Sequence, residues 1–380
     1  MRVLRCCVMG LRLSWALAVA ACGPTADGAL APNVIIERLP DGEVSMVSPS
    51  GLFVDDRDWI YVADQSPARV IVLNQQGAFV RVVGREGHGP GEFRVAVPSG
   101  SAGIVTVFDP ELQRLTQFDD SARLRWMVAA PCCRYSRITV DRRGRTWVPA
   151  PARGGAAGWD AAIGFDSTGR ARDTVDVPGS VQDPSYYWTL RDPGEEAARF
   201  STRIPLKPAN YYAISRTGQV WHGFSSAAVI AQGTSGRDRN QVAVISRPRQ
   251  SVSDAARASL VERLIAGWAK MIPEATLREL VHVADVPTSL PWFFDLATDA
   301  CDHLWVLRTP LQLAMPAEFD IFGPEGTPIG VVHLPVSADA VEAWAVGNAI
   351  LAVVTTSATG DPIVARWRFG LPSCAAPSGS

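Results

Sequence analysis

Three observations predict an all-β fold, a β-propeller of six four-stranded antiparallel blades with a short helical insertion. Four eleven-residue segments of the 380-residue chain align without gaps, and a second, shorter piece recurs after them. In addition, 28 prolines and 32 glycines are spread along the chain, as expected of many short strands joined by turns. Internal repeats of this length are typical of propellers and arrays.

The four aligned segments each predict a β-hairpin. They are Leu52–Val62, Ile138–Val148, Tyr212–His222 and Leu296–Val306. Each alternates apolar and polar residues, turns through a polar stretch rich in Asp or Gly, and continues into a second strand. The second strand carries an aromatic residue in its penultimate position, namely Tyr61, Trp147, Trp221 or Trp305. We expect these four side chains to pack between neighbouring blades.

The second repeated piece supplies the outer strands of the blades. Its copies are Val70–Gly77, Ala162–Gly169 and Phe319–Gly326, with weaker copies at Leu115–Ala122 and Val242–Arg249. Blade starts then fall near residues 52, 100, 138, 212, 296 and 343. The propeller is predicted to cover residues 33–372, followed by a disordered tail, 373–380. We expect the alternating segment Asn33–Met46 to complete the last blade and close the ring, so that no edge strand is left exposed.

A resemblance to a known family rests on the first repeat. The run Gly84–Phe93 (GREGHGPGEF), with Tyr61-Val-Ala-Asp64, Arg69 and Gly77, resembles the NHL-type repeat of six-bladed propellers. It is similar, more closely, to a large group of bacterial lipoproteins described as six-bladed β-propeller proteins. The resemblance implies that the glycine-rich run is a connection between blades. A phosphate-binding loop is not indicated, because neither a Lys-Ser/Thr end nor a following helix is present.

The first residues predict export. Residues 1–21 have a basic start and a short apolar stretch, followed by Val19-Ala20-Ala21-Cys22-Gly23, which resembles a lipobox. Lipidation of Cys22 and a tether over residues 22–32 are expected; the alternative is an ordinary secretory signal cut at Ala-x-Ala. The predicted location is the cell envelope, anchored by lipid, in the outer membrane facing the periplasm or the cell surface. The membrane is thus one predicted partner.

Composition narrows the classes of partner. The formal net charge is −2, so neither nucleic acid nor a strongly cationic partner is indicated, and a monomer is expected. Cys132, Cys133, Cys301 and Cys374 remain beyond Cys22, and a disulfide among them is possible in an oxidising compartment. Their spacing fits no zinc site. No metal site is predicted and the cofactor is left unknown.

Two connections between blades are too long to be turns. The first, residues 177–210, has a group of aromatic residues and arginines; the second, residues 253–291, contains a helix capped by Ser253 or Asp254 and ended by Pro273. Its apolar stripe is expected to pack on the side or mouth of the propeller.

The candidate binding residues are Tyr186, Tyr187, Trp188, Arg203, Tyr212, Trp292 and Phe293. Strand geometry nominates Ser50, Ser99, Ser136, Tyr212 and Phe293 for the rim of the central opening. The simpler interpretation of the first aromatic group is that it holds the loop against the propeller.

No catalytic set is evident. Asp55, Asp141 and Asp299 recur at hairpin turns, where Asp caps the turn backbone, and this recurrence indicates a structural role. The arginines 134, 137, 142, 143 and 145 are expected on a solvated turn surface, with phosphate or carboxylate contact as the alternative. The sequence therefore favours a non-catalytic binding or scaffolding module for a peptide, a glycan or an envelope protein. The alternative is a metal-dependent hydrolase or lyase of the lactonase type with its site in the central tunnel.

Overall fold

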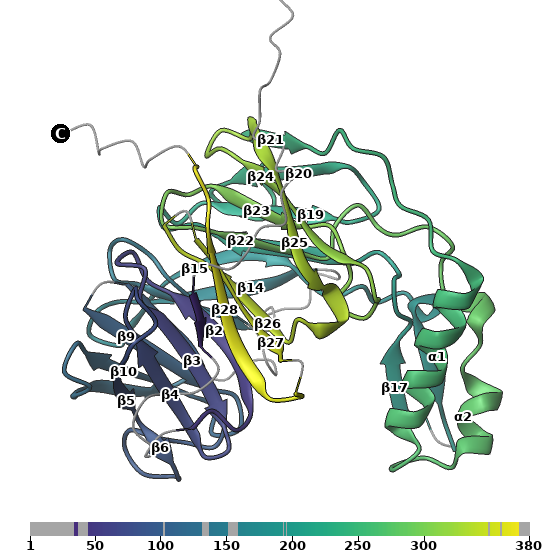
Figure 1. Ribbon diagram of the computed structural model, residues 1–380, viewed down its shortest axis with the longest axis horizontal. Helices are drawn as coiled ribbons and strands as arrows, with labels where there is room; N and C mark the ends of the chain where they lie inside the picture. The colour runs from purple at the N-terminus through teal and green to yellow at the C-terminus, as the bar shows by residue number, and fades with distance from the viewer. Residues whose placement is uncertain are drawn as a thin grey trace, which may run out of the picture.

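Six four-stranded antiparallel sheets form a closed ring of blades (Figure 1). The computed structural model describes residues 34–36, 45–101, 103–130, 137–150, 159–192, 194, 196–348, 350–357 and 359–371. Neighbouring blades contact one another in chain order, and the first strand of the last blade contacts the first strand of the first. The predicted fold class and blade number are confirmed. The predicted signal peptide, Cys22, the tether and the tail lie outside the described residues.

The blade strands begin within three residues of the predicted starts. Blade 1 consists of β2 (Pro49–Val54), β3 (Ile60–Gln65), β4 (Ala68–Leu73) and β5 (Phe79–Val83). Blade 2 consists of β8 (Val97–Ser101), β9 (Ile104–Asp109), β10 (Arg114–Asp119) and β11 (Leu124–Ala129). Blade 3 consists of β12 (Thr139–Val140), β13 (Thr146–Ala150), β14 (Trp159–Phe165) and β15 (Ala171–Pro178).

The second half of the ring repeats this order. Blade 4 consists of β18 (Asn210–Ile214), β19 (Val220–Phe224), β20 (Val229–Gly233) and β21 (Gln241–Val244). Blade 5 consists of β22 (Asp295–Thr298), β23 (Leu304–Leu307), β24 (Pro316–Phe322) and β25 (Pro328–Ser337). Blade 6 consists of β26 (Ala343–Val346), β27 (Ile350–Thr356), β28 (Pro362–Arg368) and β1 (Val34–Ile36).

The ring is closed by the first strand of the chain. β1 pairs antiparallel with β28, with Val34 opposite Arg366 and Ile36 opposite Val364. This confirms the predicted role of the segment that contains Val34–Ile36. We call the end of the ring where the first strands begin the mouth, and the opposite end, where the first hairpin turns lie, the turn face. Because β28 is a third strand and runs toward the turn face, β1 begins at the turn face.

The core lies between the blades. The four repeated aromatic residues are each at most 3% exposed and belong to apolar clusters formed by adjacent sheets. Aromatic side chains of this size supply much of the apolar area that a flat sheet interface buries. The interpretation of the repeated aromatics as packing residues is confirmed.

The glycine-rich connection after blade 1 is structural. It contains the two-residue strands β6 (Arg85–Glu86) and β7 (Glu92–Phe93), which pair with each other. Gly84 has a φ of 71°, and a Cβ atom there would lie 2.0 Å from the ring of buried Phe93. Arg114 of blade 2 donates hydrogen bonds to the carbonyl oxygens of His88 and Gly89. The run therefore joins blades 1 and 2, as the resemblance implied.

The two long insertions fold against each other into one unit, which we call the side lobe (residues 184–206 and 251–290). It contains the turn η1 (Pro184–Tyr186), the hairpin of β16 (Tyr187–Leu190) and β17 (Phe200–Arg203), the helices α1 (Asp254–Trp268) and α2 (Glu274–Leu280), and the turn η2 (Val283–Asp285). Blade 5 is followed by one further turn, η3 (Ala338–Ala340). Figure 1 shows α1, α2 and β17 standing to one side of the blades.

The apolar face of α1 packs on the side lobe and on the edge of blade 5. Its cluster contains Trp188, Ile204 and Leu206 of the first insertion together with Leu313 of the β23–β24 connection, so the expected packing on the mouth of the propeller is one part of its surroundings. Ser253 caps α1 by accepting a hydrogen bond from the backbone N–H of Ala256, as expected. The sequence showed an apolar stripe but not what it packs on. Its packing is decided by the tertiary structure, because both insertions leave the ring at the mouth and meet there. No described helix is long and apolar enough to cross a membrane.

Candidate functional site

An arginine spans the ring at the mouth. The guanidinium of Arg137, which precedes the first strand of blade 3, lies 3.0 Å from the carboxylate of Asp295 in blade 5. It also lies over the ring of Trp344 in blade 6, 4.3 Å from the centroid, and donates to the carbonyl oxygen of Trp344 at 3.2 Å. Charge-assisted and cation–π contacts together hold this side chain across the axis. The mouth is therefore lined by an ion pair and an indole.

Tyr211 of β18 extends this group toward the side lobe. Burial raises the pKa of Tyr211; the positive charge of the nearby Arg203 opposes that rise, and the negative charge of Asp295 adds to it. Tyr211 also packs on Phe293, with ring centroids 5.8 Å apart. Blades 3 to 6 and the hairpin of the side lobe thus contribute to one polar and aromatic surface.

The predicted residues of the first insertion lie together on the β16–β17 hairpin, where Tyr187 is opposite Arg203. Tyr186 is half-buried, with Lys207 Nζ 5.2 Å from its ring centroid, and the Tyr187 hydroxyl donates to a backbone carbonyl at 2.6 Å. Trp188 is buried in the lobe core, and its Nε1 donates to Asp285 at 2.8 Å. For Trp188 the geometry matches the simpler interpretation that it holds the loop in place.

Arg203 and the residues expected at the rim have different surroundings. Arg203 donates to the carbonyl oxygens of Lys207 and Pro208, the latter at 2.6 Å. Tyr212 packs between blades 3 and 4, while Phe293 is fully buried between blades 4 and 5. Trp292 is half-buried, with the Arg249 guanidinium 5.9 Å from its ring centroid.

The remaining rim residues add little to a site. Ser50 is exposed and accepts a hydrogen bond from Gln65 at 2.7 Å, while Ser99 is 4% exposed. Ser136 lies outside the described residues. At the mouth it is Tyr211, and not its neighbour Tyr212, that meets Arg203.

Sequence reasoning missed Tyr211, Asp295 and Trp344 as mouth residues. A signal was present for two of them. Arg137, Tyr211 and Asp295 each stand one position before an aligned repeat, in a column where the residue type differs from blade to blade. Variation in one column of an otherwise repeated pattern is expected where a symmetric ring builds an asymmetric site.

The arginine group near residue 140 is only partly a turn surface. Arg143 and Arg145 belong to the turn, and Arg145 pairs with Asp141 at 2.8 Å and with Asp173 at 2.6 Å. Arg142 instead reaches blade 5, where it lies 3.2 Å from Asp302. With Arg137 at the mouth, two of the five arginines therefore cross between blades, which corrects the expectation of a solvated surface. Arg134 lies outside the described residues.

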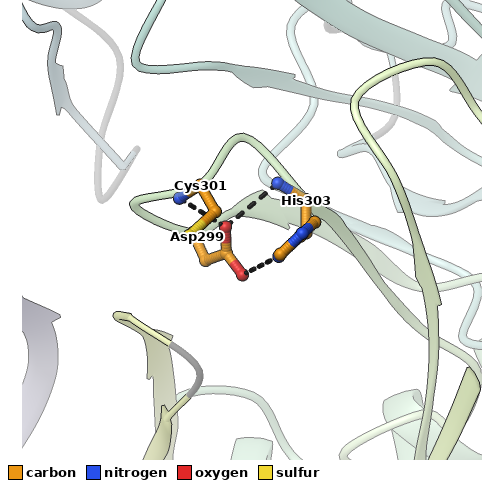
Figure 2. Close-up of side chains that lie close together, drawn as sticks. All are labelled: Asp299, Cys301 and His303. Atoms are coloured by element: carbon orange, nitrogen blue, oxygen red, sulfur yellow. Dashed lines mark hydrogen bonds and ion pairs between the residues drawn. The ribbon is translucent and has the colours of Figure 1, made fainter. Parts of the chain in front are cut away.

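Within the described part of the chain, one group of three side chains has the spacing of a metal site. Asp299, Cys301 and His303 place one ligand atom each within 4.8 Å of one another (Figure 2). Asp299, however, accepts hydrogen bonds from the backbone N–H groups of Cys301 and His303, at 2.8 and 3.0 Å, and lies 2.8 Å from Nδ1 of His303. It also accepts a hydrogen bond from Trp305 Nε1.

The sulfur at this turn is not a free ligand. Cys301 is disulfide-bonded, so it offers no thiolate to a cation. Asp299 and His303 already contact each other, and the hydrogen bonds that Asp299 accepts from the turn backbone are those of a residue that caps a hairpin turn. Cys132, Cys133 and Cys374 lie outside the described residues, so the pairing of Cys301 stays open.

The comparisons with known proteins agree with the architecture. A family model described as a 6-bladed beta-propeller matches residues 43–96. The chain is a six-bladed β-propeller. The matched segment contains the first hairpin repeat and the glycine-rich run. No curated protein matches the sequence of this propeller.

Solved structures with similar backbones are distant. One is a protein described as exported from Bacteroides fragilis, with 10% identity, a TM-score of 0.46, and coverage of 90% of this chain and 97% of that chain. Another is a catalytically inactive virginiamycin B lyase from Staphylococcus aureus with quinupristin, with 10% identity, a TM-score of 0.42, and coverage of 88% and 99%. Likeness at this level says nothing about what this propeller binds.

Proposed function

We propose that the protein is an exported, lipid-anchored binding module that presents its mouth and side lobe to a peptide, a glycan or another envelope protein. The observation that carries this proposal is the side lobe. Two insertions from either side of blade 4 build a separate apolar core there, with Trp188, Leu260, Ile265 and Leu277 among its buried residues. Closing the ring does not require this unit, since β1 already completes blade 6.

Anchoring through Cys22 would orient this surface. Because β1 begins at the turn face, the anchored end of the chain enters the propeller there. The mouth and the side lobe are then directed away from the membrane, where a partner can reach them. A lipid chain on Cys22 and a further acyl chain on the new amino terminus would make the attachment stable, because two hydrophobic anchors hold where one is reversible.

A lactonase-type metal site finds less support. The described side chains that cross the ring include Arg137 at the mouth and Arg142 and Arg216 at the turn face, and these cations repel a metal ion. The Asp299 group is engaged in a turn and a disulfide. We therefore do not propose the hydrolase as a second function.

Site-specific photo-crosslinking in intact cells tests the proposal. A photoreactive residue is placed at Met271, which is 69% exposed on the side lobe, or at Leu124, which is 44% exposed on the outer strand of blade 2. We expect discrete higher-mass adducts from position 271 and none from position 124. Equal adducts from both positions, or none from position 271 and from a further probe at Tyr186, would contradict a partner-binding role for this end of the molecule.

A further inference from the structure

A cavity lies at the turn face of the ring, at the end of the axis opposite the mouth. It has a volume of about 230 Å³ and is partly open to solvent. Its lining residues come from the first hairpin turns of five successive blades, and they are Asp56, Ser101, Arg142, Arg216 and Ala300. A cavity of this size suits a ligand smaller than a typical drug molecule.

Arg216 lines this cavity, and its side chain contacts residues of blades 1, 2 and 3. It is only 9% exposed, and its Nη1 donates to the carbonyl oxygens of Gly100 and Val140, at 2.7 and 3.1 Å. Its guanidinium lies 5.6 Å from the ring centroid of Phe53. Arg216 is not part of any ion pair among the described residues, and the carboxylates of Asp56, Asp55 and Asp302 act on its charge from a greater distance. Burial lowers the pKa of Arg216, which reflects the cost of keeping this charge away from water.

Arg142 brings a second guanidinium to the same wall. Its backbone N–H donates to the carbonyl oxygen of Arg216 at 2.8 Å, so the two residues are adjacent. Its Nη2 donates to Ala300 at 3.1 Å and lies 3.2 Å from Asp302, while half of the side chain stays exposed. A guanidinium has five N–H donors, so Arg142 keeps donors for a ligand.

The residues that line this cavity and the residues that cap the turns occupy different positions of the repeat. Asp56, Arg142, Arg216 and Ala300 occupy one column of the aligned repeats. In the column before it, the acids Asp55, Asp141 and Asp299 recur and cap their turns. The structural column repeats, whereas the cavity column carries an acid, two arginines and an alanine. The side chains of the first column are enough to cap the turns. The side chains of the second column therefore do not have to support the turn and can line a binding site.

We propose that this cavity binds a small organic acid that carries a hydroxyl group next to its carboxylate. Arginine forks match the two oxygens of a carboxylate, and the buried Arg216 forms no direct ion pair among the described residues. Asp56 on the same wall accepts hydrogen bonds, and a carboxylate has several lone pairs, so it receives the ligand hydroxyl in addition to its present contacts. The site is independent of the proposed partner binding at the mouth.

Titration calorimetry on the mature chain carrying Cys22→Ser tests this proposal. The probes are D-gluconate and L-lactate, with D-glucose and inorganic phosphate as comparisons. We expect both acids to bind, glucose not to bind, and phosphate to bind more weakly than the acids. Arg142→Gln should weaken binding about tenfold or more, since it removes charge-assisted hydrogen bonds. Arg137→Gln is the matched control at the mouth, half-exposed and paired with an Asp in the same way, and should bind as the unmodified chain does.

A cavity-filling variant covers the case in which Arg142→Gln fails to fold. Ser101→Glu places a carboxylate at the cavity wall and should abolish binding of both acids at unchanged thermal stability. Absence of binding by both acids overturns the proposal. So does equal binding of glucose and gluconate, or phosphate binding as tight as that of the acids. Loss of binding in Arg137→Gln with retention in Arg142→Gln would assign the acid to the mouth and also overturn it.

Discussion

The indole Nε1 of Trp305 donates a hydrogen bond to the carboxylate of Asp299 across 3.1 Å, six residues earlier in the chain. Trp147 makes the same bond to Asp141 at 3.2 Å in blade 3. These bonds tie the inner hairpin turn to the aromatic residue packed between the blades. In blade 4 the acid is replaced by Ser215, and Nε1 of Trp221 has no hydrogen-bond partner among the described residues.

Matched Trp→Phe variants test how much this bond contributes. Trp305 and Trp221 are both fully buried, so each change to Phe removes the same indole volume. Trp305→Phe also leaves Asp299 with one donor fewer. We expect it to lower the free energy of unfolding by about 1–2 kcal/mol more than Trp221→Phe. Urea denaturation followed by circular dichroism measures both. Equal losses would show that the bond to Asp299 adds nothing beyond packing.

Acid sensitivity is expected from His222. Burial lowers the pKa of His222, whose Nε2 lies 2.9 Å from the carbonyl oxygen of Asp238. The folded chain therefore keeps the ring neutral, while the unfolded chain takes up a proton near the ordinary value of 6.5. Below that pH the unfolded state binds more protons, so stability falls as the pH is lowered from 6.5 toward the folded pKa.

Replacement of His222 by Asn should flatten this part of the pH profile. Unfolding free energies at about pH 7.5 and about pH 5.5 give the comparison. The stability advantage of the unmodified chain over His222→Asn should shrink at the lower pH. The exposed His88, changed to Asn, serves as the control and should leave the profile as it was. An unchanged slope in His222→Asn would exclude this residue as the source.

A substitution in the core of the side lobe should destabilise the lobe without destabilising the blades. Trp188 packs on Trp268 with ring centroids 6.5 Å apart, and its Nε1 donates to Asp285 at 2.8 Å. Trp188→Phe removes this hydrogen bond inside the lobe. We expect faster amide hydrogen exchange in α1 and α2, by about tenfold, and unchanged exchange in the blades. Trp292→Phe, outside the lobe cluster, should not alter exchange in the helices. Uniform acceleration across the blades would show that lobe and ring unfold together.

Lipidation is expected to depend on Cys22 alone. Metabolic labelling with an alkyne fatty acid should mark the protein in its native host, and Cys22→Ser should remove the label because no thiol remains at the cleavage site. The Cys301→Ser variant should keep it. An unlabelled protein that begins at a residue other than Cys22 would support the ordinary secretory signal instead.

The local pattern was sufficient for most of the fold. Alternation in Leu52–Val62 and its three copies predicted the hairpins, because strands expose their two faces in turn. Ser253 marked the start of α1 through capping, whereas α1 ends at Trp268 and the predicted stop, Pro273, instead stands at the start of α2. The site was less accessible to this reasoning. Tyr212 was chosen where Tyr211 meets Arg203, because a one-residue step along a strand exchanges the faces and the repeat alone does not say which face meets the axis.

The sequence by itself determined the blade repeat, the closing strand and the residues that cap each inner turn, since these depend on contacts close along the chain or on a periodic pattern. The tertiary structure decided which side chains meet across the ring. Arg137 reaches Asp295, and Arg216 reaches Gly100, over separations of more than a hundred residues. Such pairs depend on the closure of all six blades around one axis. The physical reason is that a ring places equivalent positions of every repeat at the same point, so the chemistry there is a property of the assembled circle.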